Sequence, residues 1–197
     1  MDSLVDMTPS LAGATIYIES RYYPGWWIGA SDKYNGYIFE LSEETVFNPS
    51  EPCRLEVVDC NDGFVCLRTR YREYPATMDN SNTSSVMSNH PKLNILSGDD
   101  PRSYYLEADD DDVDFSLNTA SPADKPDWFK WKIGCTSSDM TQCYIENKYY
   151  TGAQVFQHND RYGKWLDTKY REPGDEDIWY QHRIMNPKFT EVSREVL

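Results

Sequence analysis

The side chains best suited to chemistry are the cysteines and histidines, and their spacing predicts neither catalysis nor metal binding. None of the five cysteines has a partner at the C-x-x-C spacing typical of zinc and thioredoxin-like sites. The three histidines, His90, His158 and His182, are scattered and form no metal-ligand pattern. No nucleophile elbow or phosphate-binding loop is present, and carboxylates are too numerous for any pair to stand out. The sequence therefore predicts a protein that is not an enzyme, with no metal and no cofactor.

The odd number of cysteines excludes complete pairing within the chain. Cys53, Cys66 and Cys143 fall in predicted strands, where small buried hydrophobic residues are common, and we expect all three to be reduced core residues. The first fifteen residues have neither the basic nor the apolar segment of a signal peptide. The chain as given is therefore expected to be cytoplasmic, or extracellular if a signal peptide has been removed.

Charge and aromatic content restrict the partners. The net charge of −14 repels phosphate backbones and anionic membranes, so nucleic acid is not expected as a partner. No apolar stretch approaches the ~18 residues of a membrane-spanning helix, so no membrane insertion is expected. Aromatic residues make up 14% of the chain, and 15 of them are tyrosines. Such side chains suit the wet edges of a core, sugar stacking and protein interfaces.

These residues must be positioned by elements that recur along the chain. The stretch YIESRYYPGWW at residues 17–27 returns as YIENKYYTGAQ at residues 144–154, and a weaker copy, FVCLRTRYREYPA, lies at residues 64–76. Each copy alternates like a short strand and ends in a turn, at Gly25 and Gly152 in the two closer copies. The recurrence indicates that each copy opens an equivalent structural unit.

The units also end alike, with an acidic or proline-bearing turn followed by an alternating strand. These endings are NPSEPCRLEVV (48–58), ADKPDWFKWKI (123–133) and PGDEDIWYQHRI (173–184). The three openings and endings predict units at residues 12–59, 60–134 and 135–187. They form a single domain at residues 12–187, with terminal extensions at residues 1–11 and 188–197.

The predicted fold is all-β. No apolar i, i+3, i+4, i+7 pattern extends over a dozen residues, and short strands alternate with turns. Three units of four strands predict a β-trefoil, which is a six-stranded barrel with three hairpins, in which three pseudo-repeats bury one core. The rival interpretation is a pair of Greek-key motifs like those of βγ-crystallins, because Tyr17 and Tyr144 each precede a Tyr-x-Gly turn by six residues.

The second unit is longer than the others because of an insertion. Residues 79–114 are rich in Ser, Asn and Asp and lack periodicity. They are therefore expected to form a long loop and to be the most mobile part of the chain. Asp109–Asp112 and Asp114 make an acidic run within it. The run lacks the spacing of an EF-hand, and a solvated loop is favoured over a calcium site.

One family combines these features. The Tyr-Pro-Gly turn, followed by an acidic residue and an aromatic strand, resembles the arabinose-binding domain of fungal α-L-arabinofuranosidase B, a carbohydrate-binding module with a β-trefoil fold. The resemblance covers residues 14–187 and is strongest in the third unit. There YIENKYYTGAQVFQH, WLD and DIWY match the family's opening, its Leu-Asp pair and its Asp-Ala-Thr-Phe ending.

This resemblance implies a sugar site in the third unit. His158 and Asp177 match the two residues that hold the sugar hydroxyls, and Asp167 matches the aspartate of the Leu-Asp pair. Tyr162 and Trp165 lie near enough in sequence to stack on the sugar. The other units lack the histidine, so the resemblance implies one degenerate site that binds a pentose or galactose-type sugar. The alternative is a protein-binding or structural trefoil that has lost sugar binding, with His158 in a hairpin turn and Asp177 as a turn cap.

Overall fold

The computed structural model describes residues 4–29, 40–41, 53–69, 103–108, 113–118, 120–160 and 163–186. Over these ranges the chain is mostly β-strand, with one short α-helix, α1 (Thr8–Leu11), and three 3-10 turns. The 3-10 turns are η2 (Pro122–Asp124), η3 (Asp127–Phe129) and η4 (Asp177–Tyr180). The strands are β1 (Val5–Asp6), β2 (Thr15–Ser20), β3 (Trp26–Trp27), β4 (Glu40–Leu41), β5 (Leu55–Asp59), β6 (Val65–Thr69), β7 (Ser103–Ala108), β8 (Val113–Asn118), β9 (Trp131–Cys135), β10 (Cys143–Asn147), β11 (Gln154–Asp160), β12 (Gly163–Lys169) and β13 (His182–Met185).

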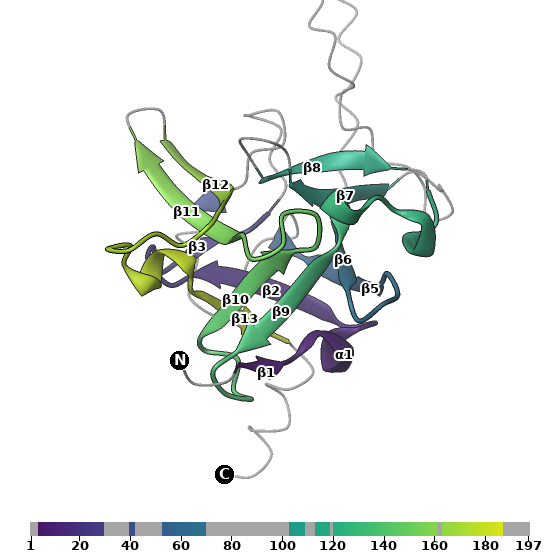
Figure 1. Cartoon of the computed structure of the whole chain (residues 1–197), viewed down its shortest axis with the longest axis horizontal. Helices are drawn as coiled ribbons and strands as arrows, with labels where there is room; N and C mark the ends of the chain where they lie inside the picture. The colour runs from purple at the N-terminus through teal and green to yellow at the C-terminus, as the bar shows by residue number, and fades with distance from the viewer. Residues whose placement is uncertain are drawn as a thin grey trace, which may run out of the picture.

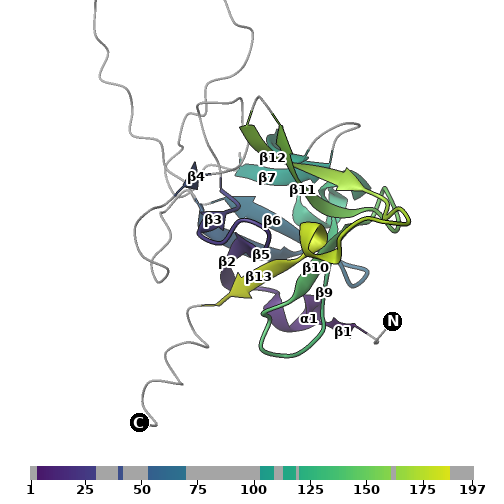
Figure 2. The same ribbon diagram turned by 90° about the vertical axis from the view of Figure 1, so that its left-hand side faces the viewer.

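Six strands close into a barrel. Antiparallel pairing runs from β2 to β5, β6, β9, β10 and β13, and β13 returns to β2. Outside this ring, β3 pairs with β4, β7 with β8, and β11 with β12, so a hairpin follows each of β2, β6 and β10. Figures 1 and 2 show hairpins β7/β8 and β11/β12 at the same end of the barrel. This pairing is that of a six-stranded barrel with three hairpins, and it differs from paired Greek keys.

The barrel core is built from the alternating positions of its strands. Ile16 and Ile18 of β2 are fully buried, as the alternation predicted, and Cys143 and Ile145 take the same positions in β10. The remaining strands contribute inward-facing side chains in the same way: Leu55, Val57, Val65, Leu67, Trp131, Ile133 and Ile184. Closure of the ring leaves these strands without a free edge, which is how a small barrel satisfies its backbone hydrogen bonds.

The N-terminal segment packs against the closed barrel. Val5 and Asp6 pair with Cys135 and Gly134 of β9, and Leu11 is fully buried in the core. The backbone N–H of Ile133 donates to Thr8 Oγ1 at 2.9 Å. None of the helices in the described ranges is long and apolar enough to cross a membrane.

The prediction of a loop over residues 79–114 is wrong in part. Residues 103–108 form β7, and β8 begins at residue 113. The sequence does alternate there, because Val113, Phe115 and Leu117 are separated by Asp114 and Ser116. The acidic run between the two strands obscured this pattern. Residues 79–102 and 109–112 lie outside the described part of the chain.

Two disulfides correct the expectation that Cys66 and Cys143 are reduced. Cys60 pairs with Cys66, and Cys135 pairs with Cys143. Each bond closes a hairpin between consecutive barrel strands, β5/β6 in the first case and β9/β10 in the second. Cys135 and Cys143 are direct partners in the β9/β10 register, whereas Cys60 follows the end of β5 and the register partner of Cys66 is Val58. Cys53 is fully buried and takes part in neither disulfide.

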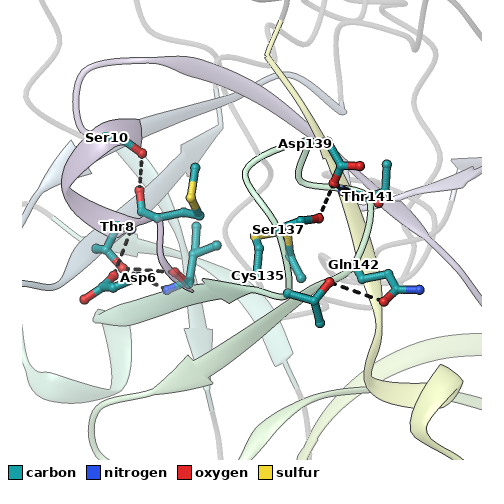
Figure 3. The surroundings of a disulfide bond; sticks show 12 residues. Asp6, Thr8, Ser10, Cys135, Ser137, Asp139, Thr141 and Gln142 are labelled. Atoms are coloured by element: carbon teal, nitrogen blue, oxygen red, sulfur yellow. Dashed lines mark hydrogen bonds between the residues drawn. A yellow bond between two sulfur atoms is a disulfide. The ribbon is translucent and has the colours of Figure 1, made fainter. Parts of the chain in front are cut away.

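The turn enclosed by the Cys135–Cys143 bond is ordered by one carboxylate (Figure 3). Asp139 Oδ1 accepts hydrogen bonds from Ser137 Oγ at 2.5 Å and from the backbone N–H and hydroxyl of Thr141 at 3.1 and 2.9 Å. The Ser137 bond and then the Thr141 bonds hold the pKa of Asp139 below its ordinary value. Thr136 Oγ1 donates to Gln142 Oε1 at 3.3 Å across the base of the turn.

Thiol counting tests this disulfide assignment. Alkylation of the denatured, unreduced protein is expected to modify one cysteine, Cys53, because the other four are oxidised. Alkylation after reduction is expected to modify all five. Intact-mass spectrometry measures both increments. Three or more modified cysteines without reductant would show that at least one of the two bonds is absent.

Candidate functional site

Asp177 lies at the start of η4 and is held by three neighbouring side chains. Its Oδ2 accepts hydrogen bonds from the Tyr144 hydroxyl at 2.7 Å and from Gln181 Nε2, and its Oδ1 forms an ion pair with Arg171. Its side chain is still 48% exposed. The carboxylate is therefore fixed in orientation and open to solvent.

These neighbours also determine the charge of Asp177. Burial acts to raise its pKa, but hydrogen bonds from Tyr144 and Gln181 and the positive charge of Arg171 prevail, so the pKa lies below its ordinary value. The carboxylate is ionised near neutral pH and can only accept hydrogen bonds. For Tyr144, burial and then the bond to Asp177 raise the pKa, so its hydroxyl remains protonated and donates.

Aromatic rings hold Arg171, the ion-pair partner of this carboxylate. The Arg171 guanidinium lies 4.8 Å from the ring centroid of Tyr144 and 4.9 Å from that of Tyr180, which fixes the cation over both rings. Phe156 contacts Tyr180 and Trp179, with ring centroids 5.1 and 5.9 Å apart. We call Tyr144, Phe156, Arg171, Asp177 and Tyr180 the Asp177 cluster.

A second carboxylate fixes the loop before η4. Asp175 Oδ2 accepts hydrogen bonds from the Tyr180 hydroxyl and from the backbone N–H of Glu172, the latter at 3.0 Å. Lys169 forms an ion pair with Asp175 at 3.3 Å. Burial and then the bond to Asp175 raise the pKa of Tyr180, so this hydroxyl is a permanent donor. The loop is thus tied to both the hairpin and η4.

The other predicted site residues lie on or beside the β11/β12 hairpin. His158 pairs with Trp165 in the hairpin register, and Asp167 pairs with Phe156 and is half-buried. The side chains of His158 and Trp165, and all of Tyr162, lie outside the described residues. The sequence analysis named Asp177 but did not name the side chains that hold it, Tyr144 and Arg171. The repetition of Tyr144 at Tyr17 was the one available signal for the former.

A surface groove of about 300 Å³ adjoins the Asp177 cluster. Its lining includes Asp6, Lys132, Gly134, Tyr144, Glu146 and Gln154. Tyr144 belongs to both groove and cluster. Gln154 also joins them, because its Oε1 accepts a hydrogen bond from Arg171 Nε at 3.1 Å. We call this feature the β10 groove.

Two further aromatic pairs, one of which includes Trp179 beside the Asp177 cluster, contain exposed rings. Tyr149 is 58% exposed and contacts Trp128, which is 37% exposed, with ring centroids 5.8 Å apart. Tyr22 is 38% exposed and contacts Trp179 in the same edge-to-face manner, at 6.2 Å. Such rings can contact either a sugar or a protein partner. The described residues contain no group of three or more His, Cys, Asp or Glu side chains that could hold a metal ion.

Comparison with known proteins identifies the fold and no family. No protein-family profile matches the chain, and no curated protein matches it. Among solved structures, the chain is similar to a Polyporus squamosus lectin bound to the human-type influenza-binding epitope Neu5Aca2-6Galb1-4GlcNAc. The TM-score is 0.54 at 10% identity, over 89% of this chain and 49% of that chain.

Two further structures match to a similar degree. Cry35Ab1 has a TM-score of 0.52 at 7% identity, over 89% of this chain and 36% of that chain. The lysenin pore has a TM-score of 0.51 at 9% identity, over 89% of this chain and 46% of that chain. This chain thus spans less than half the length of each of these three chains. Identities this low show the fold alone, and that fold is a β-trefoil, as predicted. The resemblance to the arabinofuranosidase domain stays a prediction.

Proposed function

We propose that this protein is a non-catalytic carbohydrate-binding module or lectin whose single sugar site is centred on the Asp177 cluster. The observation that carries the proposal is the exposed, ionised and oriented carboxylate of Asp177, held by the Tyr144 hydroxyl and by Arg171, which lies over the Tyr144 ring. A carboxylate accepts hydrogen bonds from sugar hydroxyls, and bonds to charged groups contribute about 1.5–3 kcal/mol each. The proposed ligand is a neutral pentose or galactose-type sugar.

The proposed site extends onto the β11/β12 hairpin. His158 is the second proposed hydrogen-bonding residue, as the family resemblance implies. Tyr162 and Trp165 supply a stacking face for the C–H surface of the sugar, and Asp167 supports the site from β12. A shallow site of this size is expected to reach roughly millimolar affinity, or about −4 kcal/mol.

The site belongs to the third of three proposed pseudo-repeats. Equivalent hydrogen bonds in the first and third units support the proposal that these units are repeats. Glu19 Oε1 accepts from Gly25 N–H at 2.8 Å, and Glu146 Oε1 accepts from Gly152 N–H at 3.0 Å. Both glycines have positive φ values, 86° and 89°, which L side chains rarely adopt. The two disulfides also lie at equivalent strand junctions. The proposed insertion in the second repeat, residues 79–114, includes β7 and the first two residues of β8.

The second repeat offers a matched comparison at Asp127. This residue starts η3 as Asp177 starts η4. Its carboxylate lies between two lysines, 3.1 Å from Lys148 and 3.4 Å from Lys130. The hydrogen bond from Lys148 is the largest influence on its pKa, which is lowered. Asp127 is thus engaged by two cations, of which Lys148 lies over the Phe64 ring at 5.2 Å, whereas the cation at Asp177 is a guanidinium that lies over two rings.

Loss of sugar binding in Asp177→Asn and His158→Ala tests the proposal. Each change removes one or two polar contacts, and a loss of about 1.4 kcal/mol already weakens binding tenfold. We expect the chemical-shift changes on titration with arabinose or galactose to disappear in both variants. Asp127→Asn is the matched control and should bind as the wild type does. Unchanged binding in Asp177→Asn, with native circular dichroism, would place the sugar site elsewhere.

The second candidate function is a protein-binding trefoil that has lost sugar binding. The exposed Tyr149–Trp128 pair favours it, because exposed aromatic side chains are enriched at protein interfaces. The two disulfides favour an oxidising compartment for either function. Absence of any sugar-induced shift in the wild type would make the protein-binding function the better proposal.

A further inference from the structure

The β10 groove exists because two positions beside β10 carry unusually small or polar residues. Tyr144 of β10 pairs with Gly134 of β9, and Glu146 pairs with Gln154 of β11. Gly134 has no side chain, and the Leu4 side chain, which also lines the groove, packs against it. A Cβ at this position would lie 3.2 Å from Leu4 Cδ1, so a larger residue would displace Leu4.

The equivalent positions beside β2 are filled. Tyr17 pairs with Met185, where β10 has Gly134 opposite Tyr144. Glu19 pairs with Trp27, where Glu146 has Gln154. Trp27 is 2% exposed and packs edge-to-face against Tyr17. Two large side chains therefore occupy the space that is open beside β10.

The equivalent positions beside β6 are filled as well. Cys66 pairs with Val58, and Arg68 pairs with Tyr105, which is 4% exposed. Of the three barrel strands that precede a hairpin, only β10 combines a glycine and an amide at these positions. The groove is thus a local departure from the pattern of the other two strands.

The cross-strand ion pairs also differ between β10 and the other two strands. At this register the other two strand pairs carry a cross-strand ion pair. Arg183 lies 3.3 Å from Glu19 between β13 and β2, and Arg68 is paired with Glu56 between β6 and β5. These four side chains neutralise one another.

Beside β10, the lysine at the corresponding position does not form an ion pair with Glu146. Lys132 is the register partner of Glu146, but it forms its ion pair with Asp6 of β1 at 3.3 Å. The Thr8 N–H donates to Asp6 Oδ1 at 3.0 Å and holds that carboxylate in place. Glu146 Oε1 accepts from Gly152 N–H, and its Oε2 has no hydrogen-bond partner among the described residues. One carboxylate oxygen therefore remains open in the groove.

The groove also offers donors. Gln154 uses its Oε1 to accept from Arg171, which leaves its NH₂ group to donate. Lys132 engages Asp6 and has further N–H bonds to give. Asp6 compensates the charge of Lys132, so the lining carries an uncompensated negative charge at Glu146 and would repel an anionic ligand. An acceptor at Glu146 beside the donors of Gln154 and Lys132 matches a neutral group that both donates and accepts, such as a pair of adjacent hydroxyls.

We propose that the β10 groove is a second saccharide subsite, which binds one sugar ring through a vicinal diol. One hydroxyl donates to Glu146 Oε2, and its neighbour accepts from Lys132 or Gln154. The volume of about 300 Å³ is at the small end of ligand sites and suits one ring. The choice of a sugar as ligand rests on the proposed function, whereas the groove itself does not. Because Tyr144 and the Arg171–Gln154 bond link the two sites, together they accommodate adjacent rings of one glycan.

Titration with galactose, arabinose and lactose, followed by amide chemical shifts, tests this subsite. Shifts are expected at Gly134, Glu146 and Gln154 as well as around Asp177. Glu146→Gln keeps the side-chain shape but turns an NH₂ group toward the groove in place of the acceptor. It is expected to weaken the affinity measured from the groove shifts about tenfold, equivalent to about 1.4 kcal/mol. Glu176→Gln removes one charge outside the groove and is the control.

A second variant, Gln154→Trp, introduces the residue found opposite Glu19 and should abolish the groove shifts by filling the space. Shifts confined to residues around Asp177 would overturn the groove subsite and leave the proposed function standing. Shifts confined to the groove would support the subsite and overturn the site at Asp177. Groove shifts that persist in both Glu146→Gln and Gln154→Trp would overturn the subsite, as would the absence of shifts with all three sugars.

Discussion

Trp131→Ala is expected to lower the free energy of unfolding by about 3–5 kcal/mol, the range for a fully buried large aromatic side chain. Trp131 has no exposed surface and lies in the barrel core. Its indole Nε1 donates to the Leu106 carbonyl oxygen at 3.0 Å, which ties β9 to β7. The substitution removes both the packing and this hydrogen bond. Urea denaturation followed by far-UV circular dichroism measures the loss.

A neighbouring tryptophan supplies the matched control. Trp128 is 37% exposed, and Trp128→Ala is expected to cost less than about 1 kcal/mol because surface substitutions rarely cost more. Trp131→Phe keeps most of the ring and is expected to cost about 1–3 kcal/mol, which keeps the test informative if the alanine variant fails to fold. Equal losses at Trp131 and Trp128 would contradict the assignment of Trp131 to the core.

Acidification is expected to destabilise the protein through His182, at a cost of about 3 kcal/mol between pH 6.5 and 4. His182 is fully buried, and burial lowers its pKa from 6.5 to about 4 despite a hydrogen bond to the Val155 carbonyl oxygen. Its Nδ1 has no hydrogen-bond partner among the described residues, so its protonation would bury an uncompensated charge. The unfolded chain therefore binds the proton first. Stability is complete above pH 6.5 and decreases as the pH falls toward 4.

The pH dependence of His182→Gln isolates this effect from the other titrating groups. The carboxylates of Asp127, Asp139, Asp175 and Asp177 have lowered pKa values, so their contribution to stability is lost only at lower pH. Denaturant midpoints measured from pH 7 to 4 should fall steeply in the wild type and much less in the variant. Parallel slopes in the two proteins would show that His182 is not buried in the neutral form.

Much of the barrel was predictable because the alternation of apolar and polar residues in each strand can be recognised within a short stretch of sequence. Alternation at Ile16, Ile18 and Ile145 follows from the two-residue period of a strand, and those side chains are buried. The disulfides were missed because hairpin geometry, and not C-x-x-C spacing, brings Cys135 opposite Cys143. Hairpin β7/β8 was missed because an acidic run divides its alternating strands.

The candidate site was less predictable because long-range contacts assemble it. Tyr144 and Asp177 are 33 residues apart in sequence but share a hydrogen bond. Arg171 completes the cluster from a loop that carries no recognisable motif. The β10 groove depends on Gly134, which becomes informative only when its register partner is known. Spacing along the chain cannot show such relations between strands.

The most direct test of the central claim is a glycan array probed with the wild type and with Asp177→Asn. Each protein is assembled on streptavidin, because a single millimolar site gains detectable avidity only when several copies engage one surface. We predict that the wild type binds pentose- or galactose-bearing glycans and that Asp177→Asn loses this binding while it keeps its fold. Absence of binding by the wild type, or equal binding by both proteins, would contradict a sugar site at Asp177.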